Sequence, residues 1–305
     1  MGIVDHTVSH VHTRSKRDGF LHSSVNPSAM DIDVGLVAQR YNERARALAR
    51  RLADHLEGRG VAVVVDEEAA DATDRDGRPV SVMGDCDLVV SIGGDGTFLY
   101  VAREASEAPI LGVNLGEVGF LNAVSPADAV DAVTAAVSEL IETGSVTGRE
   151  VDRLRAAGDD WVLELALNEV VLHAPRRGHG GGASFHVRVD GNEYVETHAD
   201  GVFVATPTGS TAYNLSEGGP LVHPTVDALV ITWMCPAEPT TPLVVGSESE
   251  VTVSIDDAES GYVISDGRDR RVLDPPETVQ IATADDPVTI AGPRDTFFQA
   301  LDKLE

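Results

Sequence analysis

From residue 34 onward, short and fully apolar runs are separated by a segment whose apolar residues have helical spacing. Three such runs, at 34–37, 61–65 and 87–92, have the length and composition of buried strands. Between the first two, apolar residues recur every three or four positions from 45 to 56. Strands that are apolar throughout need cover on both faces, as in sheets built from parallel strands. The pattern predicts an α/β domain around a parallel sheet.

The rest of this half continues the same alternation. We expect an acidic loop over 66–78, a helix from about residue 97, a strand over 110–113 and a helix over 126–142.

Beyond residue 146 the pattern changes to strict alternation. Phe185, Val187 and Val189 alternate with polar residues before an Asp-Gly-Asn turn at 190–192, and the segment 251–255 alternates in the same way. Alternating strands joined by tight turns indicate hairpins with one buried face. The sequence therefore predicts a β-rich, β-sandwich-like second domain, and a final stretch from 296 to 304 that returns to helical spacing.

These patterns divide the chain into four parts. We expect an α/β domain over 30–125, a β-rich domain over 126–290, and a C-terminal helix over 291–305. Residues 1–29 show no hydrophobic period and hold four of the ten histidines. A metal-binding tail would explain the histidines, but no second ligand type accompanies them. We favour a solvated extension or a start codon placed too early.

The charge of the chain excludes several partners. Fifty Asp and Glu stand against 23 Lys and Arg, which gives a formal net charge of -27. Nucleic acids and anionic membranes are bound by basic patches, so neither is an expected partner. Lys16 and Lys303 are the two lysines, and the other basic residues are arginines. This composition resembles proteins of salt-accumulating organisms, although an acidic protein from a GC-rich genome would also show it.

Other sequence features point to the cytoplasm. No stretch has the length of a membrane span, and the N-terminus lacks the apolar core of a signal peptide. Cys86 and Cys235 both lie in apolar surroundings, so we expect buried free thiols.

The first candidate site is a glycine-rich junction, Gly93-Gly94-Asp95-Gly96-Thr97, between a predicted strand and a predicted helix. Glycines let the backbone approach a ligand closely, and the N–H groups of a helix N-terminus hold phosphate oxygens. The loop has no lysine, so it is not a Walker-type P-loop. A carboxylate among such amides, here Asp95, would hold a cation or accept a proton from an attacking hydroxyl. A plain turn is the simpler alternative.

Together with four further motifs, this junction shows that the sequence resembles a known family. The junction itself is similar to the signature of a superfamily that contains NAD kinases, lipid kinases and, more distantly, 6-phosphofructokinases. Asp200-Gly201 is followed by a long run that resembles NAD kinases and is specific to them, Ala-Thr-Pro-Thr-Gly-Ser-Thr-Ala-Tyr-Asn-Leu-Ser at 205–216 with Gly-Gly-Pro at 218–220. The segments 112–121 and 167–170 match the same family. The resemblance covers nearly everything from Val34 to Phe298.

The resemblance implies an NAD kinase-like fold and an active site in the cleft between its two domains. In that fold 30–125 would be the phosphate-donor and catalytic-loop domain, 126–290 the dinucleotide-binding domain, and the helix over 291–305 would return to the first domain. It also implies transfer of a phosphoryl group from ATP, another nucleotide or polyphosphate to the 2′-hydroxyl of the adenosine ribose of NAD, with Mg²⁺ or Mn²⁺. It suggests a homodimer or homotetramer.

The motif positions assign roles by resemblance. Asp95 would be the catalytic proton acceptor, and Gly93, Gly94, Gly96 and Thr97 would form the loop for the phosphate donor. The residues expected to bind NAD are Asp95, Gly96, Phe120, Asn168, Glu169, His198, Asp200, Thr211, Ala212, Tyr213, Asn214, Leu215 and Ser216. Three of these residues have a simpler structural alternative: Phe120 and Tyr213 as core aromatics, and Glu169 as a paired structural carboxylate. Ser210 is expected to cap the short helix that follows it.

Three departures from the family pattern bear on substrate preference and oligomer contacts. His198 stands where many members have Arg, Arg268 stands where many have Gln after a later Asp-Gly pair, and the segment 233–239 is altered. Two alternative functions stay open at this point. One is a lipid or sugar kinase of the same superfamily, and the other is a dinucleotide sensor without catalysis.

Overall fold

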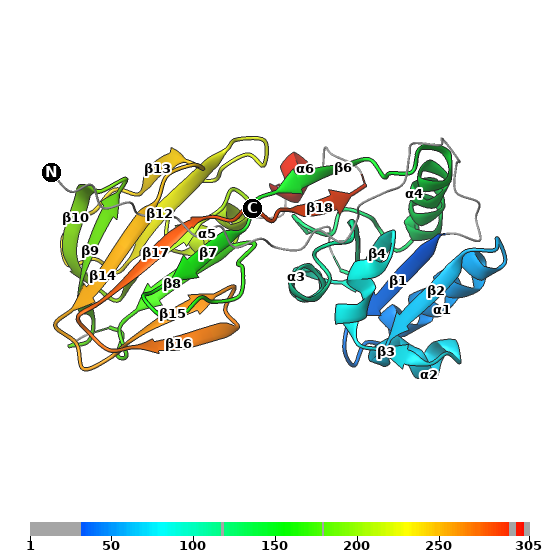
Figure 1. Ribbon diagram of the computed structural model, residues 1–305, viewed down its shortest axis with the longest axis horizontal. Helices are drawn as coiled ribbons and strands as arrows, with labels where there is room; N and C mark the ends of the chain where they lie inside the picture. The colour runs from blue at the N-terminus through cyan, green and yellow to red at the C-terminus, as the bar shows by residue number, and fades with distance from the viewer. Residues whose placement is uncertain (1–31, 117–118, 179, 293–296, 302–305) are drawn as a thin grey trace, which may run out of the picture.

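Two bodies lie side by side in the computed structural model (Figure 1). The structure describes residues 32–116, 119–178, 180–292 and 297–301. The predicted extension over 1–29 lies outside these residues.

The first body is built on a seven-stranded sheet with the order β3-β2-β1-β4-β5-β18-β6. All neighbouring strands run parallel except the last pair, β18 and β6. The strands are β1 (Asp33–Ala38), β2 (Ala62–Asp66), β3 (Gly77–Arg78), β4 (Leu88–Gly93), β5 (Ile110–Asn114), β6 (Gly148–Val151) and β18 (Val288–Ala291).

Helices cover both faces of this sheet. On one face α1 (Glu43–Glu57) packs against α4 (Ala129–Thr143), in the same core cluster as Val90 of β4. On the other face α3 (Asp95–Glu104) and a 3-10 turn at Val80–Asp85 share a cluster with Val89. Neighbouring residues of β4 are thus buried on opposite faces, which confirms the predicted parallel sheet with two covered faces.

The predicted loop over 66–78 is wrong, because it contains α2 (Glu67–Thr73) and β3. Asp66 caps α2 by accepting the N–H of Ala69 at 3.0 Å, and it also accepts the N–H of Ala38 at 3.2 Å. Glu67 and Glu68 fill the first turn, where the helix dipole favours negative charge. The acidic residues that suggested a loop therefore stabilise a helix N-terminus.

The second body is a pair of antiparallel sheets that share one core, as the alternating pattern predicts. Their orders are β10-β9-β14-β17-β7 and β13-β12-β11-β8-β15-β16. The core contains Phe185 and Val187 from one sheet and Val202 and Val204 from the other. The strands are β7 (Leu154–Ala157), β8 (Glu169–His173), β9 (Ala183–Val189), β10 (Asn192–Ala199), β11 (Gly201–Ala205), β12 (Ala228–Met234), β13 (Leu243–Gly246), β14 (Val251–Asp256), β15 (Gly261–Ser265), β16 (Asp269–Leu273) and β17 (Glu277–Thr283).

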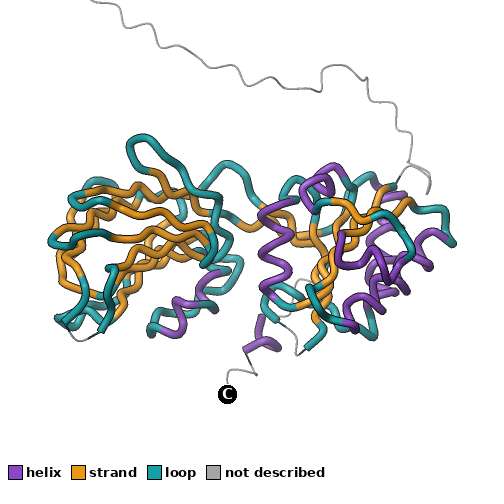
Figure 2. The backbone as a smooth tube through the Cα atoms, turned by 90° about the horizontal axis from the view of Figure 1, so that it is seen from below, coloured by secondary structure: helices purple, strands orange, loops and turns teal. Residues whose placement is uncertain are grey.

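The chain crosses between the bodies twice. It leaves the first body through β6 and returns through β18, which inserts between β5 and β6. The short α6 (Phe297–Leu301) lies where the bodies meet (Figure 2). The strands β6 and β18 belong to the sheet of the first body, and α4 packs in its core. The division of the chain at residues 125 and 290 into independent folding units stays a prediction.

Two smaller findings complete the fold. Cys86 is buried, and burial raises the pKa of its thiol to about 11. Cys235 is exposed, contrary to expectation, because β12 ends at Met234 and the backbone turns outward there with a φ of 45°. In the part of the chain that the structure describes, no helix is long and apolar enough to cross a membrane.

Candidate active site

The glycine-rich junction lies between β4 and α3, at the carboxyl edge of the parallel sheet. Gly93 is packed tightly, since a Cβ there would lie 2.4 Å from Thr97 Oγ1. Gly94 and Gly96 instead face open space, with nothing within 4 Å of a Cβ at either position. The first turn of α3 is therefore open to a ligand that accepts hydrogen bonds from backbone N–H groups.

Asp95, the first residue of α3, turns its carboxylate toward the segment 119–122. Asn122 Nδ2 donates to Asp95 Oδ1 at 3.2 Å, and the backbone N–H groups of Phe120, Leu121 and Asn122 also point at the carboxylate. Burial raises the pKa of Asp95 from its ordinary value, and these hydrogen bonds oppose the rise. Gly119 makes the approach possible, because a Cβ there would lie 2.4 Å from Asp95 Oδ1.

Glu169 is the first residue of β8, Asn168 directly precedes it, and Asp266 binds the backbone of both. The carboxylate of Asp266 accepts the N–H of Leu167 at 2.7 Å, of Asn168 at 2.8 Å and of Glu169 at 3.1 Å. Leu167 shares the core cluster of Leu121 and of α3. This apolar contact brings the Asn168-Glu169 pair to the boundary between the two bodies.

Glu169 is a buried carboxyl group with an unsatisfied oxygen. The residue is 3% exposed, and its Oε2 has no hydrogen-bond partner among the described residues. Burial, with the neighbouring charge of Asp266, raises the pKa of Glu169 to about 8. A ligand hydroxyl at this position would satisfy the free oxygen.

The segment 206–216 packs directly on the Asn168-Glu169 pair. Thr206 donates from Oγ1 to Leu167 O at 2.6 Å and from its backbone N–H to Asn168 O at 2.9 Å. Gly209 is pressed against Asn168, since a Cβ there would meet Asn168 O at 2.0 Å. The predicted helix cap at Ser210 is wrong. Ser210 lies inside a 3-10 turn at Gly209–Thr211, and its hydroxyl bonds to Pro207 O and to the N–H of Val222.

The residues of this segment differ in what they face. Thr211, Ala212 and Leu215 are half-buried, and Ser216 is exposed. Tyr213 is 60% exposed and stacks on Phe203, so it is not a core aromatic. Asn214 is fully buried in the short helix α5 (Tyr213–Ser216). Its amide donates to Ser210 O and Pro220 O and accepts from Thr232 Oγ1, so this side chain holds the segment together.

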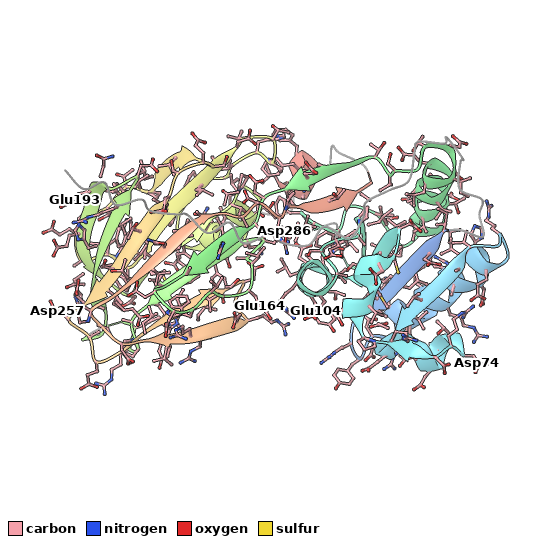
Figure 3. All side chains as sticks on the ribbon, viewed as in Figure 1. Asp74, Glu104, Glu164, Glu193, Asp257 and Asp286 are labelled. Carbon is pink, nitrogen blue, oxygen red and sulfur yellow. The ribbon has the colours of Figure 1, made fainter. Side chains whose placement is uncertain are left out.

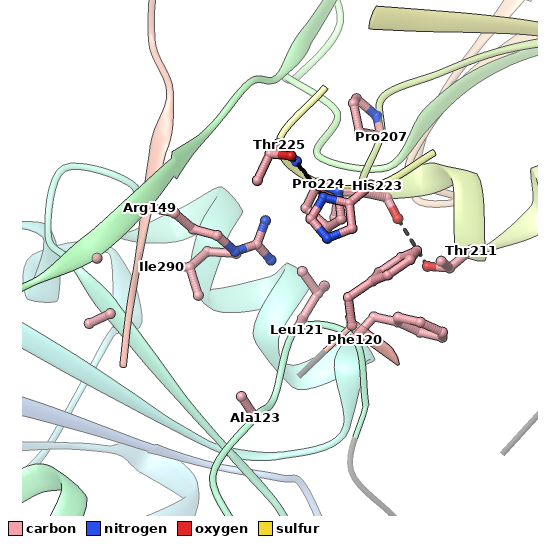
Figure 4. Close-up of a pocket in the computed structure, with 14 residues that line it drawn as sticks. Phe120, Leu121, Ala123, Arg149, Pro207, Thr211, His223, Pro224, Thr225 and Ile290 are labelled. Carbon is pink, nitrogen blue, oxygen red and sulfur yellow. Dashed lines mark hydrogen bonds between the residues drawn. The ribbon is translucent and has the colours of Figure 1, made fainter. Parts of the chain in front are cut away.

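A cavity of about 340 Å³ opens beside Phe120, at the meeting point of the bodies (Figure 4). We call it the aromatic pocket. Phe120 is half-buried in its wall, next to Phe297 with ring centroids 5.9 Å apart. The lining residues are Phe120, Leu121, Ala123, Gly148, Arg149, Pro207, Thr208, Thr211, His223, Pro224, Thr225, Ile290, Ala291 and Phe297.

A larger cavity of about 750 Å³ lies on the other side of the junction and is lined by Gly96 and Thr97. We call it the arginine pocket, because four arginines share its wall: Arg40, Arg78, Arg103 and Arg268. Arg40 follows β1, Arg78 ends β3 and Gly96 follows β4, so this pocket occupies the carboxyl edge of the sheet. Ligands of open α/β sheets bind at that edge.

Asp95 stands between the two pockets. Its carboxylate is held by the backbone of Phe120 and Leu121, which line the aromatic pocket. The next residues along α3, Gly96 and Thr97, line the arginine pocket. An ionisable group between two ligand-sized cavities can accept a proton while a group passes from one ligand to the other.

Comparisons with known proteins identify the family. The model of the ATP-NAD kinase N-terminal domain matches residues 34–141, and the model of the ATP-NAD kinase C-terminal domain matches residues 167–291. An NAD kinase of Haloarcula marismortui is 56% identical over 280 residues, which cover 89% of this chain and 99% of that relative. The chain belongs to the NAD kinase family. It is therefore a phosphotransferase with NAD kinase activity, and the lipid-kinase, sugar-kinase and sensor alternatives are not favoured.

Solved structures of the family show the same fold. The yeast NADH kinase complexed with NADH has a TM-score of 0.78 at 24% identity and covers 90% of this chain and 87% of its own. An NAD kinase from Archaeoglobus fulgidus in complex with ATP has a TM-score of 0.71 at 25% identity, with coverages of 90% and 98%. NAD kinases generally depend on a divalent metal ion. The halophilic source of the Haloarcula relative fits the acidic, lysine-poor composition.

Two of the residues that the NAD kinase motifs suggested for NAD binding lie apart from the others. His198 lies near the end of β10 and Asp200 directly precedes β11, whereas Thr206 follows the far end of β11, about 20 Å from Asp200 at about 3.3 Å per residue. Asp200 accepts the N–H of Gly178 with both oxygens, and the exposed His198 contacts Gly181 O. In this chain the two side chains stabilise the loop before β9 and stand apart from the other NAD-binding candidates.

Other residues of the site were missed by sequence reasoning. Asn122, which bonds Asp95, and the pocket arginines Arg40, Arg78 and Arg149 carry no motif of their own. The positions of Arg40 and Arg78 in the sequence could have indicated their role. Arg40 follows β1 and Arg78 ends β3, and the carboxyl ends of parallel strands meet at one edge of a sheet. No local pattern marks Arg149, whose place depends on the late insertion of β18 beside β6.

Proposed function

We propose that this chain transfers a phosphoryl group from ATP, another nucleotide or polyphosphate to the 2′-hydroxyl of the adenosine ribose of NAD, giving NADP. The placement of Asp95 between the aromatic pocket and the arginine pocket carries the proposal. The dinucleotide would occupy the aromatic pocket and its surroundings, and the phosphoryl donor would occupy the arginine pocket.

Asp95 would orient the acceptor hydroxyl and take its proton. Its half-buried position raises its pKa, which makes the carboxylate a better proton acceptor than an exposed aspartate. Four hydrogen bonds from the segment 120–122 fix its direction. Phosphoryl transfer through a loose transition state needs little covalent help, so such positioning is most of what the protein must supply.

The donor phosphates would be held by the open first turn of α3 and by arginines. The space around Gly94 and Gly96 is open, so their backbone N–H groups can receive donor phosphates, whereas the N–H of Thr97 already donates to Gly94 O at 2.9 Å. Arg40, Arg78 and Arg268 line the same cavity with exposed side chains. In a chain with a net charge of -27, the four arginines of this cavity outnumber its three carboxylates, Asp66, Glu67 and Glu68, and so offset part of the repulsion that a polyphosphate would otherwise meet.

A divalent ion, Mg²⁺ or Mn²⁺, would be held jointly by donor and protein. Among the residues that the structure describes, no three His, Cys, Asp or Glu gather into a metal-binding group. Mg²⁺ needs only one or two carboxylates beside substrate phosphates, and Asp66 and Glu67 of the arginine pocket fit that requirement. The ion would neutralise charge on the donor phosphates.

The acceptor residues would act in three groups. Phe120 and Thr211 line the aromatic pocket, Asn168 and Glu169 offer groups for ribose hydroxyls, and Tyr213 presents an exposed ring for stacking. Ala212, Leu215 and Ser216 would supply further contacts from the same segment, whereas Asn214 would act only through its internal hydrogen bonds. His198 and Asp200 keep their proposed NAD-binding role on the family resemblance alone.

We further propose a homodimer or homotetramer that works in the cytoplasm. The edge strands of the larger antiparallel sheet carry exposed apolar side chains, Val244 on β13 and Val272 on β16. Apolar residues on sheet edges suit burial against a second copy. Light scattering in molar KCl would give the mass of the assembly.

A matrix of donors and acceptors tests the proposed reaction. The purified protein is incubated in molar KCl and Mg²⁺ with ATP or polyphosphate, and with NAD or NADH. We expect a phosphorylated dinucleotide, and phosphorus NMR should place the new phosphate on the adenosine ribose 2′-oxygen. Phosphate at another position, or a lipid or sugar product in a parallel screen, would contradict the proposal.

A further inference from the structure

Arg149 is a cation that points into the aromatic pocket. It lies on β6, directly opposite Ile290 of β18 in the antiparallel pair, and both residues face the cavity. Its guanidinium points toward His223 and Leu121 (Figure 4). The neighbouring Glu150 is exposed and points to the other face of the pair, as alternation along a strand requires.

Within the described part of the chain, Arg149 has no partner. No ion pair or hydrogen bond involves its side chain, and its Nη1 is buried and unsatisfied. Burial lowers the pKa of the guanidinium, and no neighbouring carboxylate opposes this shift. Arg149 is half-buried, and its buried Nη1 lacks an acceptor beside a cavity, which indicates that an anion belongs there.

The pocket itself favours an anion. No Asp or Glu is found among the described residues that line it, although the chain has 50 of them. Among the lining residues that the structure describes, Arg149 is thus the one with a permanent charge. An anionic ligand would gain a charge-assisted hydrogen bond from a half-buried guanidinium whose Nη1 is already removed from water.

The other walls of the pocket suit a planar group. Phe297 contacts both Phe120 and His223, with ring centroids 5.9 Å and 5.0 Å apart. Thr208 and Thr211 add hydroxyl groups on the side of the second body. A cavity of about 340 Å³ is at the lower end of the usual range of ligand sites, and half a dinucleotide is a matching size.

We propose that Arg149 binds the diphosphate of the dinucleotide acceptor while the aromatic walls hold its adenosine. The inference rests on the proposed function, because the ligand is the acceptor of that reaction. Arg149 would then be a specificity-determining residue. It would select phosphate-linked adenosine over free adenosine and leave the chemical step to Asp95.

Calorimetry with two ligand fragments tests this assignment without needing turnover. ADP-ribose keeps the diphosphate and adenosine lacks it. In Arg149→Gln we expect the Kd of ADP-ribose to rise about 10- to 100-fold, the effect of losing a hydrogen bond to a charged group. The Kd of adenosine should change less than twofold. Arg149→Lys, which keeps the charge, should recover part of the ADP-ribose affinity.

Arg155→Gln is the matched control, because Arg155 is exposed on β7, the next strand along the chain but in another sheet, and lines neither pocket. It should leave both affinities unchanged. If Arg149→Gln melts early, Arg149→Met keeps the apolar stem and removes only the charge.

Equal losses for both fragments, or no loss for ADP-ribose, would overturn the assignment of Arg149. If the wild-type protein makes NADP in that case, the proposed function stands. Failure of the wild-type protein to bind either fragment would overturn the assignment as well, and absence of NADP formation would separately contradict the proposed function.

Discussion

Gly119 is the residue on which the position of the Asp95 carboxylate depends most directly. A Cβ at Gly119 would lie 2.4 Å from Asp95 Oδ1, so Gly119→Ala must displace the carboxylate or the loop. We expect kcat to fall at least tenfold, because small misplacements of a catalytic group are costly. Gly116→Ala is the control, since its Cβ meets nothing closer than 3.7 Å. Steady-state kinetics measure kcat for both variants. Equal losses of kcat in the two would contradict the assigned geometry.

Glu169 should make stability depend on pH. Its pKa is about 8 in the folded protein and about 4.5 in the unfolded chain, so the folded state alone keeps the proton between these values. The stabilisation that the protonated Glu169 contributes is therefore complete below about pH 4.5 and is lost as pH rises toward 8. The loss is on the order of 5 kcal/mol, because the two pKa values differ by about 3.5 units and each unit is worth about 1.4 kcal/mol.

Glu169→Gln cannot lose this proton, so it should become more stable relative to wild type as pH rises. Melting temperatures of both proteins between pH 5 and 8 measure the difference. A gap that stays constant across this range would show that Glu169 is ionised in the folded protein. Other carboxylates with raised pKa values, such as Asp66, cancel in the comparison.

At the scale of elements, the segment 206–216 combines one structural side chain with one exposed side chain. Asn214→Ala removes three buried hydrogen bonds and leaves Thr232 Oγ1 without its acceptor, so we expect a loss of about 2 to 3 kcal/mol in unfolding free energy. Tyr213→Ala, one position earlier on the surface, should cost little stability and weaken NAD binding. Denaturant unfolding and NAD titration measure both effects, and the reverse pattern would contradict the assigned roles.

Elements whose residues are close in sequence could be predicted well. The strands β1, β2, β4 and β5 were evident from their apolar runs, and the glycine-rich junction from its place after one of them. The helix α2 was missed because its acidic residues favour a helix only once Asp66 caps it. Exposed Cys235 was missed because its apolar neighbours belong to β12, which ends one residue earlier.

Features that depend on distant pairing could not be predicted. β18 joins the first sheet from the far end of the chain, and this insertion places Ile290 and Arg149 in the aromatic pocket. For the same reason, the sequence could not show that Asp200 and Thr206 lie at opposite ends of one strand. The motif residues revealed the chemistry of the site, but their grouping depends on the register of the sheets.

At the scale of the whole molecule, charge is the dominant feature. Acidic side chains project from both bodies, for example Asp74 and Asp257 at opposite ends (Figure 3). With a net charge of -27 these groups repel one another, and salt screens them. The Debye length falls from about 10 Å at 0.1 M to about 3 Å at 1 M, so most long-range repulsion disappears over that range.

Stability and activity should therefore rise with KCl into the molar range. Improvement beyond about 1 M would come from ion binding or from stronger apolar burial. Melting temperature and NADP formation are measured from low to molar KCl, with NaCl as a second salt at equal ionic strength. A melting temperature that stays flat or falls would contradict adaptation to salt and leave the kinase activity unaffected.

The central claim is that Asp95 accepts the proton of the NAD hydroxyl between two pockets, and Asp95→Asn tests it most directly. The asparagine side chain has the same shape as aspartate, and its amide oxygen can still accept the hydrogen bond from Asn122 Nδ2. The amide cannot accept the proton of the NAD hydroxyl. In molar KCl, kcat for NADP formation should fall about 10² to 10⁴-fold, while the Kd of NAD from calorimetry changes less than threefold. A variant that retains most of its turnover, or one that loses NAD binding in proportion to its activity, would contradict the account.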